Sequence, residues 1–175
     1  MKQEKILFDG FHKIIEVEAH IKEEVVKREK LVLKPAVAGI VIDEDGKIGL
    51  VTQYRPVIQQ KTKEIPAGVM DKDGLSPVET LIEELMEECE IPRTDILSIS
   101  ETPIHEYFMM AGSSEASISI YEIHVTAQTN KTVTDSEVEC VEWVTIDEMK
   151  SFLNQGWIVD GKTILAYYYL KSKFA

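Results

Sequence analysis

The segment that most limits the possible folds of this chain runs from Ser76 to Ile91 and reads SPVETLIEELMEECEI. Serine as N-cap, proline at the first helical position and Glu79 three residues after the serine form a capping box, which predicts the start of a helix. Ile91 and Pro92 predict its end. The apolar residues at helical spacing, which predict one buried face, are Val78, Leu81, Ile82, Leu85 and Cys89.

Strand patterns flank this helix on both sides. Apolar residues that alternate with polar ones, or form short β-branched runs, predict strands over residues 4–33, 36–43, 48–54, 63–70, 96–104, 116–125 and 138–146. Asp45 and Gly46 predict a hairpin turn between two central strands. Thr145 and Glu148 form a second capping box for a helix to about residue 154, and Asp160 predicts the N-cap of a last helix over 162–174. This order predicts an α+β fold.

Composition excludes several classes of protein. The chain has 175 residues, of which 44% are hydrophobic and 29% charged, as is typical of one globular domain. Its net charge of −12 argues against a nucleic-acid partner. Cys89 and Cys140 stand far apart without a Cys/His cluster, so we expect no disulfide framework and no zinc site. The sequence shows no signal-peptide pattern and no apolar run of about 18 residues, so we expect no membrane partner and a cytoplasmic location.

The predicted helix carries six glutamates and no basic residue. At about 100° per residue, Glu84, Glu87 and Glu88 fall within one arc, and the other three fall within a second arc. Like charges four residues apart destabilise a helix. No basic residue lies between Lys72 and Arg93, so we expect compensation from a distant group or a bound cation. Hard cations such as Mg²⁺ or Mn²⁺ favour clustered oxygen ligands, whereas a solvated acidic face is the alternative.

The segment EIPAGVMDKDGLSPVETLIEELMEECEI resembles the Nudix box, whose pattern is G-x5-E-x7-R-E-U-x-E-E-x-G-U with U aliphatic. Gly68 matches the opening glycine, and the residues from Glu84 to Glu88 match the E-U-x-E-E core. The spacing before the helix is one residue longer than the pattern. Three positions depart from it, with Leu75 in place of the first glutamate, Glu83 in place of the arginine and Glu90 in place of the late glycine. In the resembled family that arginine is associated with the first glutamate and helps to orient the metal-binding glutamates. Because both charges are altered together, the resemblance implies rearranged contacts around those glutamates and a change in catalytic rate more than in metal binding.

Three further stretches resemble the branch of ADP-ribose pyrophosphatases: QYRPVIQQKTKEIPAG, AGSSEASISIYEI and TILAYYYL. The resemblance implies a Nudix-type α/β/α sandwich of mixed sheets, with a central catalytic helix and C-terminal helices, over residues 35–175. Residues 1–34 are then an N-terminal region of antiparallel strands. In the resembled branch this region exchanges between protomers and helps to build the substrate site, so the resemblance implies a homodimer.

The same resemblance implies a metal site and its ligands. Glu84 and Glu88 are the principal ligands of Mg²⁺ or Mn²⁺, Glu87 assists in binding and catalysis, and the backbone carbonyl of Ala67 completes the shell. Glu115, in a loop of small residues, acts as general base or as an extra ligand. The alternative for Glu115 is a surface glutamate at the start of a strand.

Substrate contacts are expected from three other residues. Arg55 is predicted to donate to a phosphate, with a salt bridge to the acidic cluster as an alternative that does not exclude it. Glu64 supports the site, or only pairs with Lys61 or Lys63. Arg28 contacts the substrate from the N-terminal strands, or is an ordinary surface arginine.

These roles imply a metal-dependent hydrolase that cleaves the pyrophosphate of a nucleoside diphosphate sugar, with ADP-ribose converted to AMP and ribose 5-phosphate. The alternative, motivated by Leu75, Glu83 and Glu90, is a nucleotide-sugar binding or sensing protein of this fold with little or no turnover.

Overall fold

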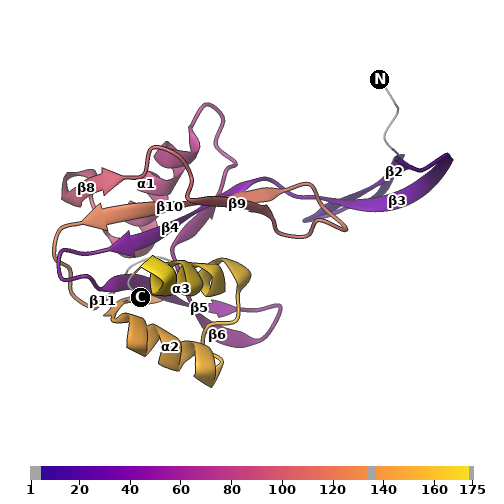
Figure 1. Ribbon diagram of the computed structural model, residues 1–175. Helices are drawn as coiled ribbons and strands as arrows, with labels where there is room; N and C mark the ends of the chain where they lie inside the picture. Colours follow the sequence, from indigo (N-terminus) through magenta and orange to yellow (C-terminus); the bar gives the residue numbers. More distant parts are fainter. Residues whose placement is uncertain (1–4, 134–136, 174–175) are drawn as a thin grey trace.

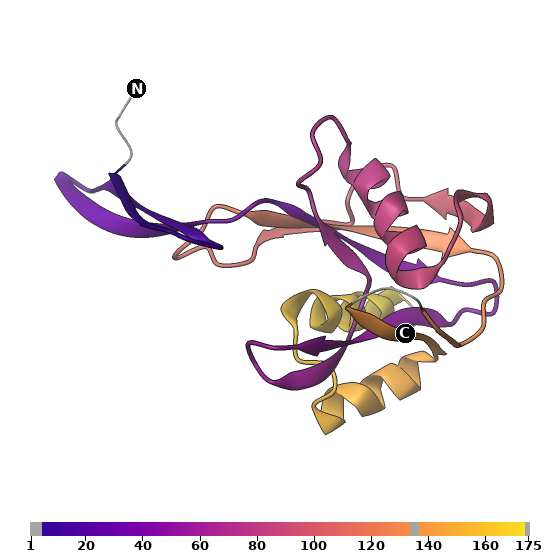
Figure 2. The ribbon, with the colours of Figure 1, turned by 180° about the vertical axis from the view of Figure 1, so that it is seen from behind.

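The computed structural model describes residues 5–133 and 137–173 and consists of two sheets and three helices. The predicted N-terminal strands form a separate antiparallel sheet, in the order β1-β2-β3, that extends away from the rest of the molecule (Figures 1 and 2). Its strands are β1 (Lys5–Asp9), β2 (Lys13–Ile21) and β3 (Glu24–Val32). The first four residues of the expected N-terminal region, and Phe174 of the expected last helix, lie outside the described ranges.

The second sheet has nine strands, with the main order β11-β12-β5-β4-β10-β8. Strands β6, β7 and β9 extend it by pairing with β5, β4 and β10 respectively, and β4 runs parallel to β10. The strand bounds are β4 (Ala36–Ile42), β5 (Ile48–Arg55), β6 (Gln60–Glu64), β7 (Ala67–Val69), β8 (Ile96–Ile99), β9 (His105–Phe108), β10 (Ser117–Val125), β11 (Lys131–Thr132) and β12 (Val138–Val144).

The predicted hairpin turn is present, but its two strands separate after a single pair. Ile42 opposite Ile48 is the pairing of β4 with β5, and the remainder of β4 pairs with β7 and β10. The expected strand over 63–70 is also divided in two, because Pro66 has no N–H to continue a ladder. As a result β6 pairs with β5 while β7 pairs with β4.

The helices begin where the capping boxes predict. Ser76 and Glu79 bond reciprocally at the start of α1 (Pro77–Cys89), and Thr145 and Glu148 do so for α2 (Ile146–Gln155). The Asp160 carboxylate accepts a hydrogen bond from the Thr163 N–H at 3.2 Å and so caps α3 (Gly161–Lys173). A short 3-10 turn, Arg93–Asp95, follows α1.

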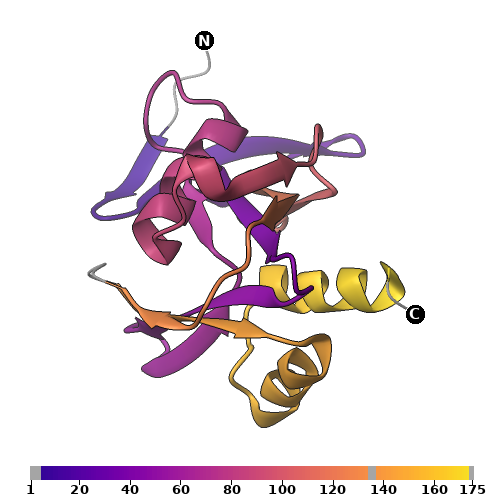
Figure 3. The same cartoon turned by 90° about the vertical axis from the view of Figure 1, so that its left-hand side faces the viewer.

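The large sheet separates two apolar layers, one packed with α1 and the other with α2 and α3. Figure 3 shows α1 on the opposite side of the sheet from α2 and α3. All seven residues of β4 are buried, and their side chains alternate between the two faces. Val37 and Val41 pack with Leu81 and Leu85 of α1, whereas the alternate residues of β4 pack with the C-terminal helices. This arrangement confirms the predicted α+β sandwich, with α1 held over β4 and β7.

Helix α1 ends at Cys89, so Glu90 does not lie on the second helical arc as the sequence spacing suggested. Glu90 is the C-cap and adopts the left-handed conformation, with φ of 50°. Glycine reaches this conformation without strain. The late glycine of the Nudix pattern corresponds to this left-handed position, where this chain has Glu90.

Candidate metal and substrate site

Helix α1 places Glu84 directly over strand β7. A Cβ atom added to Gly68 would come within 2.1 Å of the Glu84 carboxyl group. The bare Cα of Gly68 therefore leaves the space that this side chain fills. The opening glycine and the first helix glutamate of the matched pattern are in contact in the folded chain.

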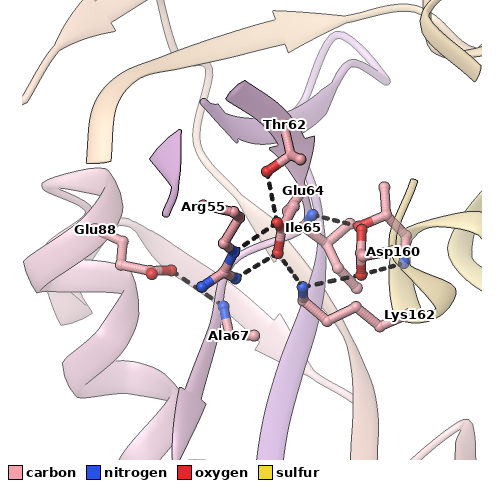
Figure 4. Close-up of polar contacts among 9 residues, drawn as sticks. Arg55, Thr62, Glu64, Ile65, Ala67, Glu88, Asp160 and Lys162 are labelled. Carbon is pink, nitrogen blue, oxygen red and sulfur yellow. Dashed lines mark hydrogen bonds and ion pairs between the residues drawn. The ribbon is translucent and has the colours of Figure 1, made fainter. Parts of the chain in front are cut away.

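Glu88 lies against the backbone of the same strand. Its Oε2 accepts a hydrogen bond from the Ala67 N–H at 3.1 Å (Figure 4). Three members of the expected ligand set, Glu84, Glu88 and Ala67, are therefore brought together where α1 crosses β7. Strand β7 is held there because Ala67 and Gly68 pair with the buried strand β4.

Glu87 lies beside Lys72, which precedes α1 and was therefore not placed by the helical spacing. Lys72 Nζ is 2.6 Å from Glu83 Oε2 and 3.4 Å from Glu87 Oε1, so this lysine bridges the two predicted arcs. Lys72, 11 and 15 residues away in the sequence, is therefore a distant group of the kind expected to compensate these carboxylates. Both contacts lie at the surface, where water screens them, and Glu84 remains outside them.

The electrostatic environment of Glu84 favours a bound cation. Burial is the largest cause that raises the pKa of Glu84, to about 7, and the neighbouring charge of Glu87 raises the pKa further. Within residues 5–133 and 137–173, no three acidic, histidine or cysteine side chains are grouped closely enough to form a ready metal site. Carboxylate and backbone carbonyl oxygens are nevertheless the ligands that Mg²⁺ and Mn²⁺ prefer, so the chemistry of Glu84, Glu88 and the Ala67 backbone fits such an ion.

Arg55 is held by a buried carboxylate from the adjacent strand. Its Nε and Nη2 donate to the two oxygens of Glu64 at 2.9 and 2.6 Å, in a bidentate pair (Figure 4). The same carboxylate accepts a hydrogen bond from Thr62 at 2.7 Å and pairs with Lys162 of α3. Neither Lys61 nor Lys63 is the partner of Glu64, because these lysines pair with Glu139 and Glu142 of β12.

The acidity of Glu64 reflects these donors. Burial raises the pKa of Glu64, but the hydrogen bonds from Arg55, Lys162 and Thr62 and the charge of Lys162 outweigh burial and lower the pKa to about 2. Arg55 in turn responds to Glu88 of α1, whose charge is one of those that raise its pKa. Figure 4 shows Arg55 between Glu88 and Glu64, and its side chain remains 42% exposed.

A cavity of about 500 Å³ opens beside Arg55, a size typical of small-molecule sites. Apolar side chains form much of its wall, and Asp160 and Lys162 lie at the start of α3 on its polar side.

Sequence reasoning assigned Asp160 only as a helix cap and did not single out Thr62 or Lys162. No pattern in the chain links these residues with Arg55, because Lys162 is 98 residues from Glu64. The apolar side chains of the wall include Val57, Ile58, Tyr107, Met109 and Val159.

Arg28 and Glu115 line a different cavity, of about 380 Å³, between the N-terminal sheet and the loop that precedes β10. Glu115 is exposed and its Oε1 is 2.5 Å from Lys30 Nζ. The Leu31 N–H donates to the Ser113 carbonyl at 2.8 Å, so this loop is attached to β3. The structure thus brings Glu115 together with Arg28, and none of the α1 glutamates lines their cavity.

In the described part of the chain, no helix has both the length and the apolar character needed to cross a bilayer.

Comparison with known proteins links this geometry to a family. The family model described as NUDIX domain matches residues 32–167. The chain is 30% identical over 152 residues to the ADP-ribose pyrophosphatase of Bacillus subtilis (strain 168), a match that covers 85% of this chain and 78% of that protein. It is also 31% identical over 151 residues to the methanol dehydrogenase activator of Bacillus methanolicus, with 83% and 76% covered.

Proposed function

The chain belongs to the Nudix family, and from that premise we propose that it hydrolyses the pyrophosphate of a nucleoside diphosphate sugar, with ADP-ribose as the preferred substrate. The observation that carries this proposal is the placement of Glu84 and Glu88 of α1 against Gly68 and Ala67 of β7. The likeness to a protein named ADP-ribose pyrophosphatase supports the choice of substrate.

Glu84, Glu88 and the Ala67 carbonyl are the proposed ligands of Mg²⁺ or Mn²⁺, and Glu87 assists them. A divalent ion bound there would neutralise phosphate charge and acidify the attacking water. In the overall reaction, water adds to one phosphorus and the bridging oxygen leaves with the other phosphate, which gives AMP and ribose 5-phosphate.

The chain's own side chains supply orientation and proton transfer. Arg55, half-exposed beside the cavity, donates to a phosphate oxygen while Glu64 holds its guanidinium from behind. Glu115 takes the proton of the attacking water as general base. In the described structure Glu115 is paired with Lys30, so this role requires that it leave Lys30 and move toward α1.

The N-terminal region of residues 1–34 is proposed to form a homodimer contact and to bring Arg28 to the substrate. The described part of this region exposes apolar side chains that a lone protomer leaves in water, among them Phe8 of β1 at 56% and Phe11 of the β1–β2 turn at 98% exposure. Light scattering should give a dimer for the wild type, and a monomer for a variant with Phe8→Glu and Phe11→Glu. A wild-type monomer at assay concentrations would exclude this part of the proposal. The proposed location is the cytoplasm.

A panel of substrates tests the activity. The protein with Mg²⁺ or Mn²⁺ is incubated with ADP-ribose, other nucleotide sugars, dinucleoside polyphosphates and nucleoside triphosphates, and release of AMP or phosphate is measured. We expect ADP-ribose to have the highest kcat/KM of the panel. A higher value for a nucleoside triphosphate would refute the proposed substrate class.

The second candidate is a nucleotide-sugar sensor with little turnover. Glu83 at the arginine position, now paired with Lys72, and Glu90 in a left-handed turn favour it, because both alter the helix that holds the ligands. The likeness to a protein named as an activator is a further reason to test it. Saturable binding of ADP-ribose without hydrolysis of any substrate in the panel would support this candidate.

A further inference from the structure

We propose that Lys162 is a positioning residue that acts through Glu64 to fix the direction and the available charge of Arg55 at the substrate cavity. This inference rests on the proposed function of Arg55 as a phosphate donor. It concerns a residue at the opposite end of the sequence, which the metal site does not include.

Four groups of alternating charge form a continuous chain of contacts (Figure 4). Arg55 of β5 pairs with Glu64 of β6, Glu64 pairs with Lys162 of α3, and Lys162 Nζ lies 2.9 Å from Asp160 Oδ2. The Glu64 side chain is 2% exposed and that of Lys162 is 11% exposed, so the middle of this chain is shielded from water.

The start of α3 is fixed at the strand that carries Glu64. The Ile65 N–H donates to Thr163 Oγ1 at 2.9 Å, and Thr163 has no exposed surface. Asp160 caps the helix through the Thr163 N–H and also contacts Lys162. The lysine is therefore presented to Glu64 by fixed backbone, and the long side chain has little freedom to leave it.

The first consequence concerns geometry. Both oxygens of Glu64 already accept from Arg55, and Lys162 and Thr62 occupy further acceptor positions on the same carboxylate. A carboxylate with four donors has one orientation, so the plane of the Arg55 guanidinium is fixed as well. The substrate therefore meets an arginine whose direction is set before binding.

The second consequence concerns charge. If Arg55 were the only cation beside Glu64, the carboxylate would neutralise most of its positive charge. Lys162 shares the carboxylate and leaves Arg55 with positive charge that an anionic ligand in the cavity can use. Removing the Lys162 charge should therefore weaken ground-state binding of a diphosphate and leave the chemical step largely unchanged.

Lys162→Met tests this inference because methionine keeps the length of the side chain and removes its charge. We expect KM for ADP-ribose to rise about tenfold with kcat within about twofold, and Lys162→Arg to restore most of the loss. Asp160→Asn, which keeps a helix cap, should raise KM by about threefold. This variant tests the inference even if Lys162→Met does not fold.

Lys173→Met provides the matched control. Lys173 also lies on α3 and also pairs with a buried strand carboxylate, at 2.6 Å from Glu122, but Glu122 holds no arginine at the cavity. A purely structural role for Lys162 predicts that both variants lower Tm and that neither changes KM. An unchanged KM in Lys162→Met, or an equal rise in Lys173→Met, would overturn the proposal.

Binding of inorganic pyrophosphate, measured by calorimetry in the presence of Mg²⁺, separates this inference from the proposed activity. If the wild type binds pyrophosphate but hydrolyses nothing, the proposed hydrolase is wrong, and a Kd about tenfold higher in Lys162→Met alone still supports the role of Lys162. A wild-type protein that binds neither pyrophosphate nor ADP-ribose overturns both.

Discussion

Glu84 of α1 and Glu64 of β6 are two glutamates whose surroundings shift their pKa values in opposite directions. Burial raises the pKa of both carboxyl groups. Glu84 also has Glu87 as a negatively charged neighbour and reaches about 7, whereas Glu64 has Arg55 and Lys162 and falls to about 2. A bound cation would therefore stabilise the charged form of Glu84, whereas Arg55 and Lys162 already stabilise the charged form of Glu64.

This difference agrees with the two separate tasks proposed for these carboxyl groups. A carboxyl group such as Glu84, whose charged form is disfavoured by burial and by the charge of Glu87, suits the binding of a metal ion. A carboxylate bonded to two cations and a hydroxyl suits the permanent orientation of an arginine. Variants of the two groups should therefore differ, with kcat/KM reduced most by changes to the α1 carboxylates and stability reduced most by changes to Glu64.

The largest effect is expected for Glu88→Gln. Loss of one proposed ligand should lower kcat/KM for ADP-ribose by about a hundredfold or more, because metal stabilisation of the transition state is worth several kcal/mol. Glu83→Gln is the matched control, since Glu83 lies on the same helix but pairs with Lys72 at the surface. An equal loss in Glu83→Gln would mean that helix charge in general, and not a ligand, is being measured.

Glu64→Gln should mainly lower stability, by about 2 kcal/mol in denaturant unfolding, because Arg55 and Lys162 then lose the buried carboxylate that they share and Lys162 keeps only its pair with Asp160. This loss is smaller than is usual for a buried pair because Arg55 is partly solvated. Glu139→Gln, which breaks an exposed pair with Lys61, should change stability by less than about 0.5 kcal/mol. Equal losses in the two variants would remove the distinction between buried and exposed pairs.

Gly68→Ala should reduce kcat/KM by about tenfold, an intermediate effect. The added methyl group would overlap the Glu84 carboxyl group, so this side chain must move away from β7. We expect the apparent affinity for Mg²⁺, read from the metal dependence of the rate, to fall more than Tm does. Full activity with unchanged metal dependence would show that contact between Gly68 and Glu84 is not needed.

The smallest effect is a pH-dependent one on the metal-free protein. Because the folded-state pKa of Glu84 is raised to about 7 from 4.5, its contribution to stability is fully present below about pH 4.5 and is lost as pH rises through 7. Glu84→Gln, which stays neutral, should therefore be more stable than the wild type at pH 8 and equal to it at pH 4.

The difference should stay below about 1 kcal/mol, since water screens this partly exposed group. Thermal unfolding with chelator at the two pH values measures it. Saturating Mg²⁺ at pH 8 should raise Tm of the wild type and have little effect on Glu84→Gln. A stabilisation of Glu84→Gln that is the same at both pH values would contradict the assigned pKa.

Local signals in the sequence accounted for much of the fold. Both capping boxes start helices at the predicted residues, because a cap depends on side chains only three positions apart. The register of β4 and β5 could not be predicted in the same way. Their turn was correct, but competition from β7 and β10 for the edges of β4 decided where the pair ends. The break between β6 and β7 has a signal in the sequence, because Pro66 lacks an N–H. Only the sheet shows the result, which is that β6 pairs with β5 and β7 pairs with β4.

The same division applies to the site. The sequence by itself determined that Glu84, Glu87 and Glu88 share one side of a helix, since their spacing and the helical period are both local. Only the tertiary structure decided the neighbours of these residues. It places Glu84 against Gly68, and it places Lys72 between Glu83 and Glu87. It also brought Lys162 to Glu64 across 98 residues. The physical reason is that ion pairs depend on distance in space, and the packing of α1 and α3 on the sheet sets those distances.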